Sequence, residues 1–159
     1  MAATARFIVD AMLGSLARKL RIFGFDTLYF REGADQELET LAKAESRAIV
    51  TADRALAAHA RKRGIAVLEV SGKTDRARLR SLAVQAGLAS VKLAPAEPRC
   101  AACNSSLQRL GRAATTGRVP ESVRMRHRLF FCCAQCGRVY WRGGHWTRLR
   151  GLSSLVNQR

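Results

Sequence analysis

Two pairs of closely spaced cysteines constrain this chain more than any other feature of its sequence. Cys100 and Cys103 form the first CxxC pair, and Cys133 and Cys136 form the second. Two residues between the thiolates allow both sulfur atoms to reach one tetrahedral ion from a tight turn, and two such pairs across a loop are the pattern of a zinc ribbon. Because protein fills all four positions, we expect a structural zinc ion with no open coordination position for catalysis.

The alternatives for these cysteines are a set of buried thiols and a redox-active pair. Isolated core cysteines rarely fall into two CxxC pairs, and neither pair lies where a strand passes into a helix. Gly137, directly after the second pair, supplies the permissive backbone that a metal-binding turn needs. Cys132 is one residue too far from Cys136 for CxxC spacing, so we expect it to take no part in metal binding.

The chain before these cysteines is predicted to alternate between strands and helices. Short apolar runs predict strands over residues 7–9, 27–30, 48–51 and 65–70. Apolar residues at helical spacing, with acids in first turns and glycines past the ends, predict helices over residues 12–23, 35–44, 53–63 and 74–86. Short connections between them predict an α/β fold, in which a mainly parallel sheet is covered by helices on both faces.

Changes in composition divide the chain into four expected segments. Pro95 and Pro98 interrupt the alternation, and the cysteines follow them. We therefore expect an α/β domain over residues 1–90, a linker over 91–99, a zinc ribbon over 100–146 and a basic C-terminal tail over 147–159.

The chain is strongly basic, with a formal net charge of +16 over 159 residues. Residues 96–159 hold 12 arginines and two acids, whereas residues 1–95 hold 16 Lys and Arg against 10 Asp and Glu. Such an excess of arginine favours a polyanionic partner, usually nucleic acid. An anionic membrane is the alternative, but the sequence has no strongly basic amphipathic helix with a wide apolar face.

No apolar run approaches the roughly 18 residues that a membrane-spanning helix needs. Residues 1–6 also lack the basic-then-apolar order of a signal peptide. We therefore expect a cytoplasmic protein with no membrane partner. In a reducing compartment, cysteines with paired spacing bind metal more often than they form disulfides.

Three aspartates follow the predicted strands of the α/β domain. Asp10 ends the first strand, Asp35 lies past the second, and Asp53 follows the third. The carboxyl ends of parallel strands meet at one edge, so we expect these carboxylates to gather there. Clustered carboxylates repel one another unless a cation neutralises them, and Mg²⁺ or Mn²⁺ suits oxygen ligands. Such an ion activates water and stabilises the charge on a phosphoryl group under attack.

Each acid also has a simpler interpretation. Asp35 and Asp53 occupy positions where acids commonly begin helices without any further role. Asp10 is harder to explain in this way, because a charge between an apolar strand and a helix is poorly placed for a core. Glu37 lies within reach of the same edge as an additional acid, whereas Glu69 and Asp75 are weaker candidates.

Beyond these residues, the chain resembles the Mut-seven C-terminal RNase family, in which a PIN-like ribonuclease domain is joined to a zinc ribbon. The matching residues are Phe7 to Asp10 with Met12 to Gly14 and Leu16 to Arg18, Asp35 with Leu38, Thr51 to Arg54 with Leu56, the four paired cysteines, and Gly137 to Gly143 with His145 and Trp146. The resemblance covers nearly the whole chain, and its last motif is the most specific.

The resemblance implies a PIN-like nuclease fold for residues 1–90 and RNA as the substrate. It further implies a metal-dependent ribonuclease, in which Asp10, Asp35 and Asp53 form the catalytic site for Mg²⁺ or Mn²⁺. Small PIN-like ribonucleases are often held in check by a partner, so a protein inhibitor belongs to the same expectation.

Arginines interleave with aromatic residues around the second cysteine pair, as in surfaces that hold phosphates and stack unpaired bases. The candidate RNA contacts there are Arg128, Arg138, Trp141, Arg142, His145 and Trp146. In the α/β domain they are Arg18, Lys19 and Arg54, which follow the acids. Arg21 lies on the same predicted helix as Arg18 and is a further basic residue for guiding substrate to the acids. The alternative is that some of the aromatic residues only pack around the zinc and that the helix charges are merely solvated.

Three functions are therefore under consideration. The first is a metal-dependent ribonuclease whose zinc ribbon assists RNA binding. The second is a non-catalytic protein that binds RNA or a ribonucleoprotein through the same basic surface. The third is a protein-interaction module. The intact aspartates favour the first over the second, and the density of arginine argues against the third because interface cores are usually depleted of charge.

Overall fold

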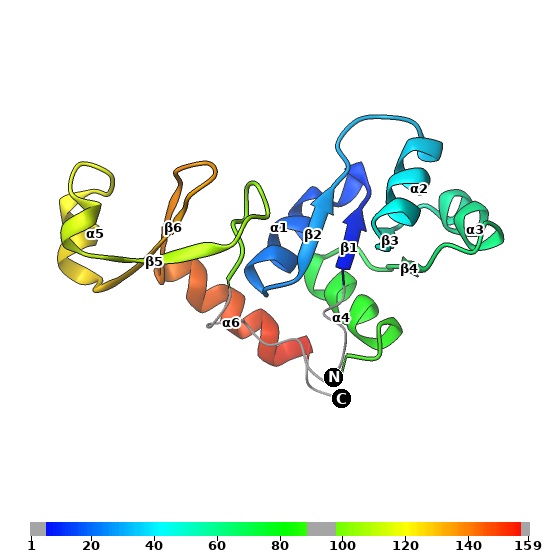
Figure 1. Cartoon of the computed structure of the whole chain (residues 1–159). Helices are drawn as coiled ribbons and strands as arrows, with labels where there is room; N and C mark the ends of the chain where they lie inside the picture. Colours follow the sequence, from blue (N-terminus) through cyan, green and yellow to red (C-terminus); the bar gives the residue numbers. More distant parts are fainter. Residues whose placement is uncertain (1–5, 89–97, 157–159) are drawn as a thin grey trace.

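The computed structural model describes residues 6–88 and 98–156, without the side chains of residues 145 and 153–156. These ranges form an α/β part and a smaller antiparallel part (Figure 1). Most of the linker expected over residues 91–99 lies outside the described residues. In the described part of the chain, no helix is long and apolar enough to cross a membrane.

A four-stranded parallel sheet forms the centre of the α/β part. Its strands lie in the order β2-β1-β3-β4, with bounds β1 Arg6–Val9, β2 Asp26–Tyr29, β3 Ala48–Thr51 and β4 Val67–Glu69. The register places Val9 beside both Tyr29 and Val50, so the carboxyl ends of the first three strands lie level. This confirms the parallel sheet predicted from the alternating segments.

Helices cover both faces of this sheet. They are the short 3-10 helix η1 Ala11–Leu13 and the α-helices α1 Gly14–Ile22, α2 Asp35–Ala44, α3 Arg54–Lys62 and α4 Asp75–Gln85. Phe7 and Val9 pack with α1 and α4, whereas the intervening Ile8 packs with α2 and α3. Strand side chains alternate between faces, and burying each large apolar one contributes about 2 kcal/mol. Two hydrophobic cores therefore hold three layers together.

The second part contains a three-stranded antiparallel sheet in the order β5-β6-β7. Its elements are β5 Leu107–Gly111, η2 Ala113–Thr115, α5 Glu121–Arg126, β6 Leu129–Cys133 and β7 Val139–Trp141, followed by the helix α6 Gly144–Val156. Most of the segment expected as a basic tail thus lies in α6. There Leu149 is buried and Leu152 packs against the core that includes α4, so the end of α6 returns to the α/β part (Figure 1).

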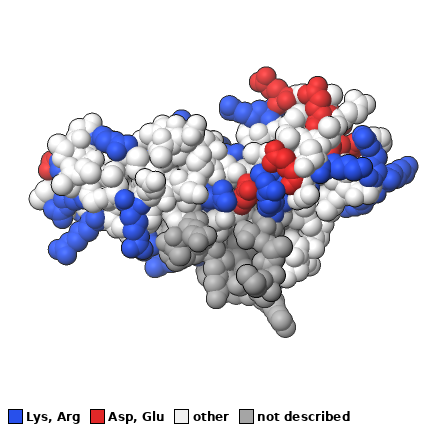
Figure 2. Space-filling model, viewed as in Figure 1, with Lys and Arg blue, Asp and Glu red and all other residues white. Residues whose placement is uncertain are grey.

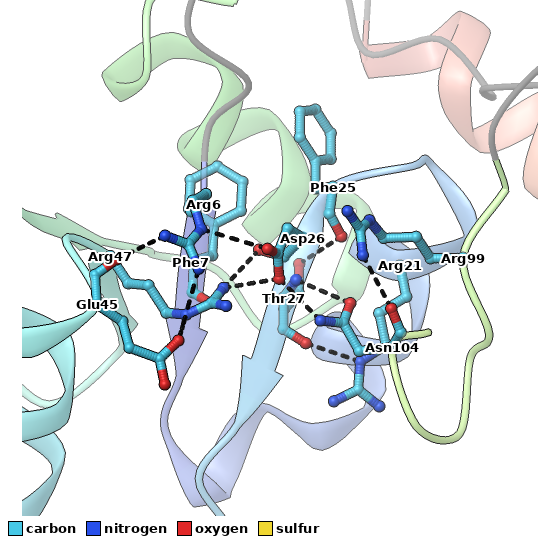
Figure 3. A network of polar contacts seen from close by, with 10 residues as sticks. All are labelled: Arg6, Phe7, Arg21, Phe25, Asp26, Thr27, Glu45, Arg47, Arg99 and Asn104. Atoms are coloured by element: carbon cyan, nitrogen blue, oxygen red, sulfur yellow. Dashed lines mark hydrogen bonds and ion pairs between the residues drawn. The ribbon is translucent and has the colours of Figure 1, made fainter. Parts of the chain in front are cut away.

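A polar network joins the turn after Cys103 to the edge strand β2 (Figure 3). The buried Asn104 accepts a hydrogen bond from the Thr27 N–H through Oδ1 at 3.0 Å and donates through Nδ2 to Asp26 Oδ1 at 2.8 Å. Arg47 donates to the same Asp26 oxygen at 2.8 Å, and Arg6 donates to the other at 3.3 Å. Asn104 therefore satisfies a backbone donor of the edge strand that would otherwise need water or another strand.

Arg21 forms a second connection between the two parts. Its guanidinium is buried, and Nε donates to the Thr27 carbonyl at 2.8 Å. Nη1 donates to the carbonyl oxygens of Ala101 and Ala102 at 3.0 and 2.9 Å. Hydrogen bonds from a charged donor are stronger than neutral ones, and the planar fork fixes their directions. The first cysteine turn is thereby held at a fixed position against α1.

Candidate active site and metal centre

The strand order creates a topological switch point between β1 and β3, because the chain leaves β1 for β2 on one side and returns to form β3 on the other. Ligands of parallel α/β sheets bind outside the carboxyl ends of the strands at such points. Asp10 directly follows β1, and Asp53 lies just beyond the end of β3 at Thr51. The fold therefore brings two of the three predicted catalytic aspartates to the position where a ligand is expected.

The hydroxyl of Thr51 links these two aspartates. Thr51 is fully buried, and its Oγ1 donates to Asp10 Oδ2 at 2.9 Å while it accepts from the Asp53 N–H at 2.9 Å. Asp53 Oδ1 in turn caps α3 by accepting from the N–H groups of Ala55 and Leu56 at 2.7 and 3.1 Å. Among the described residues, the other oxygen of each aspartate has no hydrogen-bond partner, so both remain available to a ligand.

Asp35 has no hydrogen bond to Asp10, Thr51 or Asp53 among the described residues. It is the exposed first residue of α2 and has no ion pair among the described residues. Glu37 is also exposed, and its carboxylate lies over Gly33, where a Cβ atom would come within 2.7 Å of Glu37 Oε2. Among the described residues, the carboxylate oxygens of Asp10, Asp35 and Asp53 do not all lie within 4.8 Å of one another.

The two weaker acidic candidates are neutralised by neighbouring cations. Asp75 accepts from Ser15 Oγ and from Lys19 Nζ, each at 2.6 Å. Burial raises the pKa of Asp75, but the hydrogen bonds from Lys19 and Ser15 outweigh it and lower the pKa overall. Glu69 pairs with Arg61 at 2.9 Å. Lys19, predicted as an RNA contact, therefore has a carboxylate partner within the protein.

The four cysteines of the two CxxC pairs form the second candidate centre. Their sulfur atoms all lie within 4.8 Å of one another, with 3.6 Å between those of Cys100 and Cys136 and 3.4 Å between those of Cys103 and Cys133. A tetrahedral ion with zinc–sulfur bonds of about 2.3 Å separates its ligands by roughly 3.8 Å. The cluster therefore fits a small module built around a metal such as zinc.

The acid–base properties of these thiols also favour a cation. Hydrogen bonds with Ser105 lower the pKa of Cys103 to about 6, whereas burial raises the pKa of Cys133 to about 12. Burial also raises the pKa of Tyr140, whose hydroxyl lies 3.1 Å from Cys100 Sγ. Thiolates this close together repel one another, and a divalent ion that binds them supplies the missing positive charge.

The two cysteine turns share one backbone geometry. Asn104 follows the first pair with φ of 70°, and Gly137 follows the second with φ of 72°. Each donates its N–H to the carbonyl of the first cysteine of its pair, at 2.9 Å in both turns. Gly137 was predicted from the sequence to have this role. Asn104 was not, although asparagine tolerates the left-handed region better than most residues. Cys132 is not part of the cluster, as expected.

A comparison with known proteins identifies a family whose model covers both the acidic edge and the four cysteines. A family model described as the Mut7-C RNAse domain matches residues 5–152. The chain belongs to the Mut7-C RNase domain family. No curated protein and no solved structure matches it significantly. Because the match spans the α/β part and the cysteine cluster together, it indicates a ribonuclease-type function for the whole unit, with RNA as the substrate class.

The RNA contacts predicted for this Mut7-C domain occupy several different surfaces. In the view of Figure 2, basic side chains are spread over both parts, whereas most acidic ones gather on the α/β part. Trp141 is 37% exposed, and the guanidinium of Arg142 lies 5.1 Å from the centre of the Trp146 ring. Arg54 and Arg128 are exposed. The side chain of His145 lies outside the described residues.

Arg18 and Arg138 are the predicted contacts that the fold brings together, since both line a cavity between the two parts. Arg21, which also lines this cavity, was expected from the sequence to guide substrate toward the acids, whereas Arg31 was not predicted. Arg31 lies in no recognisable motif, and its proximity to Arg138 depends on how the cysteine module packs against α1. Thr51 was missed for the same reason, since its role depends on the pairing of β1 with β3.

Proposed function

We propose that this Mut7-C domain is a ribonuclease that hydrolyses RNA phosphodiester bonds with the help of Mg²⁺ or Mn²⁺. The observation that carries the proposal is the hydrogen-bonded set of Asp10, Thr51 and Asp53 at the switch point of the sheet. The buried Thr51 hydroxyl joins the Asp10 carboxylate to the backbone N–H of Asp53. Each aspartate keeps one carboxylate oxygen for a ligand, so the pair is a suitable donor set for a hard cation.

In this proposal, Asp10, Asp35 and Asp53 hold the ion, and Glu37 is an additional acid at the same edge. When bound, Mg²⁺ or Mn²⁺ would supply an activated water and a counter-charge for the phosphate under attack. Thr51 fixes the orientation of the Asp10 carboxylate, and the helix-capping bonds of Asp53 fix its rotamer. Asp35 is the first residue of α2 and is exposed, so its carboxylate is accessible to an ion from solvent.

We further propose that the four cysteines hold a structural Zn²⁺ and that the ribbon around them assists RNA binding. With four sulfur donors and no water position, the ion keeps the two cysteine turns in place and takes no part in hydrolysis. The arginines and exposed aromatic residues of this part supply phosphate contacts and stacking surfaces.

The alternative function is a non-catalytic RNA- or ribonucleoprotein-binding protein. It is favoured by one observation, namely that Asp10, Asp35 and Asp53 do not form a group whose ligand atoms all lie within 4.8 Å of one another among the described residues. In that case the basic surface would bind RNA and the acidic edge would hold no catalytic ion.

The proposed function is tested by cleavage of a labelled, mixed-sequence RNA by the zinc-loaded protein, with added Mn²⁺, with added Mg²⁺ and with neither. The test variant is Asp10→Asn/Asp53→Asn, because asparagine keeps the acceptor for Thr51 and is also a good helix cap. Glu121→Gln, which removes an acid on α5 far along the chain, is the control.

We expect metal-dependent cleavage that falls on the order of 100-fold or more in the double variant and is unchanged in the control. Equal background cleavage by all proteins, with RNA still bound, would contradict the nuclease proposal and support the RNA-binding alternative.

A further inference from the structure

A cavity of about 440 Å³ lies between the α/β part and the first cysteine turn. Its walls come from α1, from the end of β2 and from the cysteine module. The lining residues are Gly14, Arg18, Arg21, Tyr29, Arg31, Ala101, Ala102 and Arg138. Four of these eight residues are arginines and none is acidic, so the cavity is a concentration of positive charge.

These arginines differ in how much of their hydrogen-bonding capacity is used. Arg21 is buried, and it donates hydrogen bonds to the backbone carbonyls of Thr27 in β2 and of Ala101 and Ala102 in the first cysteine turn. Arg18 and Arg138 have no ion pair or side-chain hydrogen bond among the described residues, and Arg31 only lies over the Tyr29 ring at 5.8 Å. Neighbouring guanidinium groups without acidic partners repel one another, and an anion that they share relieves this repulsion.

The chemistry of the lining selects one class of anion. Guanidinium groups match the oxygens of phosphate in pairs of parallel hydrogen bonds, and several of them around one cavity favour a group with high charge density. The aromatic ring of Tyr29 with Arg31 above it adds a surface on which a neighbouring base can stack. A nucleic-acid phosphate therefore suits the cavity.

The cavity also lies next to the candidate active site. Tyr29 Oη donates to the carbonyl of Ala11 at 2.7 Å, and Ala11 directly follows Asp10. A Cβ atom on Gly14 would lie 2.6 Å from Tyr29 Oη, so glycine is what allows the tyrosine to lie over the first turn of α1. One wall of the cavity is thus attached to the residue that follows Asp10.

We propose that this cavity binds a phosphate group of the RNA through Arg18, Arg31 and Arg138, and that it positions the strand beside Asp10. The inference deepens the proposed function, on which its positioning role rests, but RNA binding in the cavity does not require cleavage. The phosphate is either an internal phosphodiester or the terminal phosphate of a strand, since both present the same oxygens to the arginines.

The test measures the affinity of the zinc-loaded full chain for a fluorescently labelled single-stranded RNA without added Mg²⁺ or Mn²⁺, over a range of salt concentrations. The test variant is Arg31→Ala/Arg138→Ala, which removes no hydrogen bond that the described residues form. The control is Arg76→Ala/Arg80→Ala, which removes the same charge from two exposed positions of α4. Zinc content and melting temperature establish that each variant is folded.

We expect Kd to rise about tenfold in the cavity variant and at most about threefold in the control, with a shallower dependence on salt in the cavity variant. If the cavity variant loses affinity both for RNA with a 5′-phosphate and for RNA with a 5′-hydroxyl, the cavity binds an internal phosphate. If it loses affinity only for the 5′-phosphorylated RNA, the cavity binds a terminal phosphate. Equal effects of the cavity variant and the control would overturn the proposal.

The outcome is independent of the nuclease test. If the wild-type protein cleaves no RNA but the cavity variant still loses affinity selectively, the nuclease proposal fails and the phosphate cavity stands. If cleavage requires Asp10 but the cavity variant binds RNA as the control does, the cavity proposal fails and the nuclease proposal stands.

Discussion

Thr51 is the single residue on which the geometry of the acidic edge depends most. Its hydroxyl is the shared partner of the Asp10 side chain and the Asp53 backbone. Valine has nearly the same shape but lacks the hydroxyl, so Thr51→Val should leave the core filled while it frees the Asp10 carboxylate to rotate. We predict that the rate of metal-dependent RNA cleavage falls roughly 10- to 100-fold, which is the usual effect of removing a residue that holds a metal ligand in place.

The matched variant Thr51→Ser retains the hydroxyl and should keep most of the activity. Because the half-buried Asp10 carboxylate and the Asp53 N–H both lose their partner in Thr51→Val, the free energy of unfolding should also fall by about 1–2 kcal/mol. Single-turnover cleavage and urea unfolding of both variants check the two effects. Equal activity of the valine and serine variants would show that Thr51 does not position Asp10.

Asn104 combines two roles that a single substitution can separate. It has φ of 70°, and its side chain bonds both Thr27 and Asp26. Asn104→Gly keeps the backbone relaxed and removes only the side-chain bonds, which should cost about 1–3 kcal/mol. Asn104→Ala adds the strain of a left-handed alanine, about 1–2 kcal/mol more. Chemical unfolding of the zinc-loaded variants checks this order, and an alanine variant as stable as the glycine variant would contradict it.

At the scale of single elements, the edge strand β2 depends on an ionised Asp26. Burial raises the pKa of Asp26, but hydrogen bonds from Arg47 and Asn104 outweigh it and lower the pKa to about 2. Because the folded pKa lies below the unfolded value of about 3.9, this contribution is fully present above about pH 4 and is lost as the pH falls toward 2. It amounts to about 2 kcal/mol at neutral pH.

We therefore predict that Asp26→Asn destabilises the protein by about 2 kcal/mol at pH 7 and that the difference from wild type shrinks between about pH 4 and pH 2. Urea unfolding at several pH values measures it. Zinc thiolates are also protonated in acid, and release of the cysteine turn removes the Asn104 hydrogen bond to Asp26, which shrinks the difference in the same direction. A difference that stays constant down to pH 2 would mean that Asp26 titrates normally.

The elements themselves differ in how well the sequence predicts them. The strands and helices of the α/β part follow from apolar spacing, because each buries a periodic set of side chains such as Leu16 and Leu20 of α1. Helix α6 was expected only as a basic tail. It contains Gly151 and two arginines, and it is stabilised by packing of Leu149 and Leu152 rather than by local propensity. Packing against a distant part of the chain does not produce a periodic pattern of apolar residues in the local sequence, so the helix was not predicted.

The residues of the candidate site likewise divide into those that the local sequence predicts and those that depend on tertiary packing. The positions of Asp10 and Asp53 follow from where the strands end, and the cysteine cluster follows from spacing alone. The phosphate cavity could not be predicted, because Arg31 and Arg138 meet only when the cysteine module docks on α1 and β2. Local sequence thus identifies groups within one element, whereas groups that two packed parts share require the fold.

At the scale of the whole molecule, the cysteine module acts as an integral part of the α/β fold. The first cysteine turn presents the carbonyls of Ala101 and Ala102 to Arg21 and the side chain of Asn104 to β2. Removal of the metal should release this turn and leave the Arg21 charge and the Thr27 N–H without their partners. We therefore predict that metal loss destabilises the α/β part as well as the module that contains the cysteines.

This prediction is checked by thermal unfolding and amide hydrogen exchange of the zinc-loaded and metal-free protein. We expect Tm to fall by about 10 °C or more on metal removal, and the Thr27 amide to lose protection together with those of the cysteine turns. Cys133→Ser should reproduce the loss. Cys132→Ser, which changes the neighbouring thiol outside the cluster, should leave Tm nearly unchanged. Unaltered protection of Thr27 in the metal-free protein would mean that the α/β part holds its edge strand without the metal, and that the two parts are coupled only through α6.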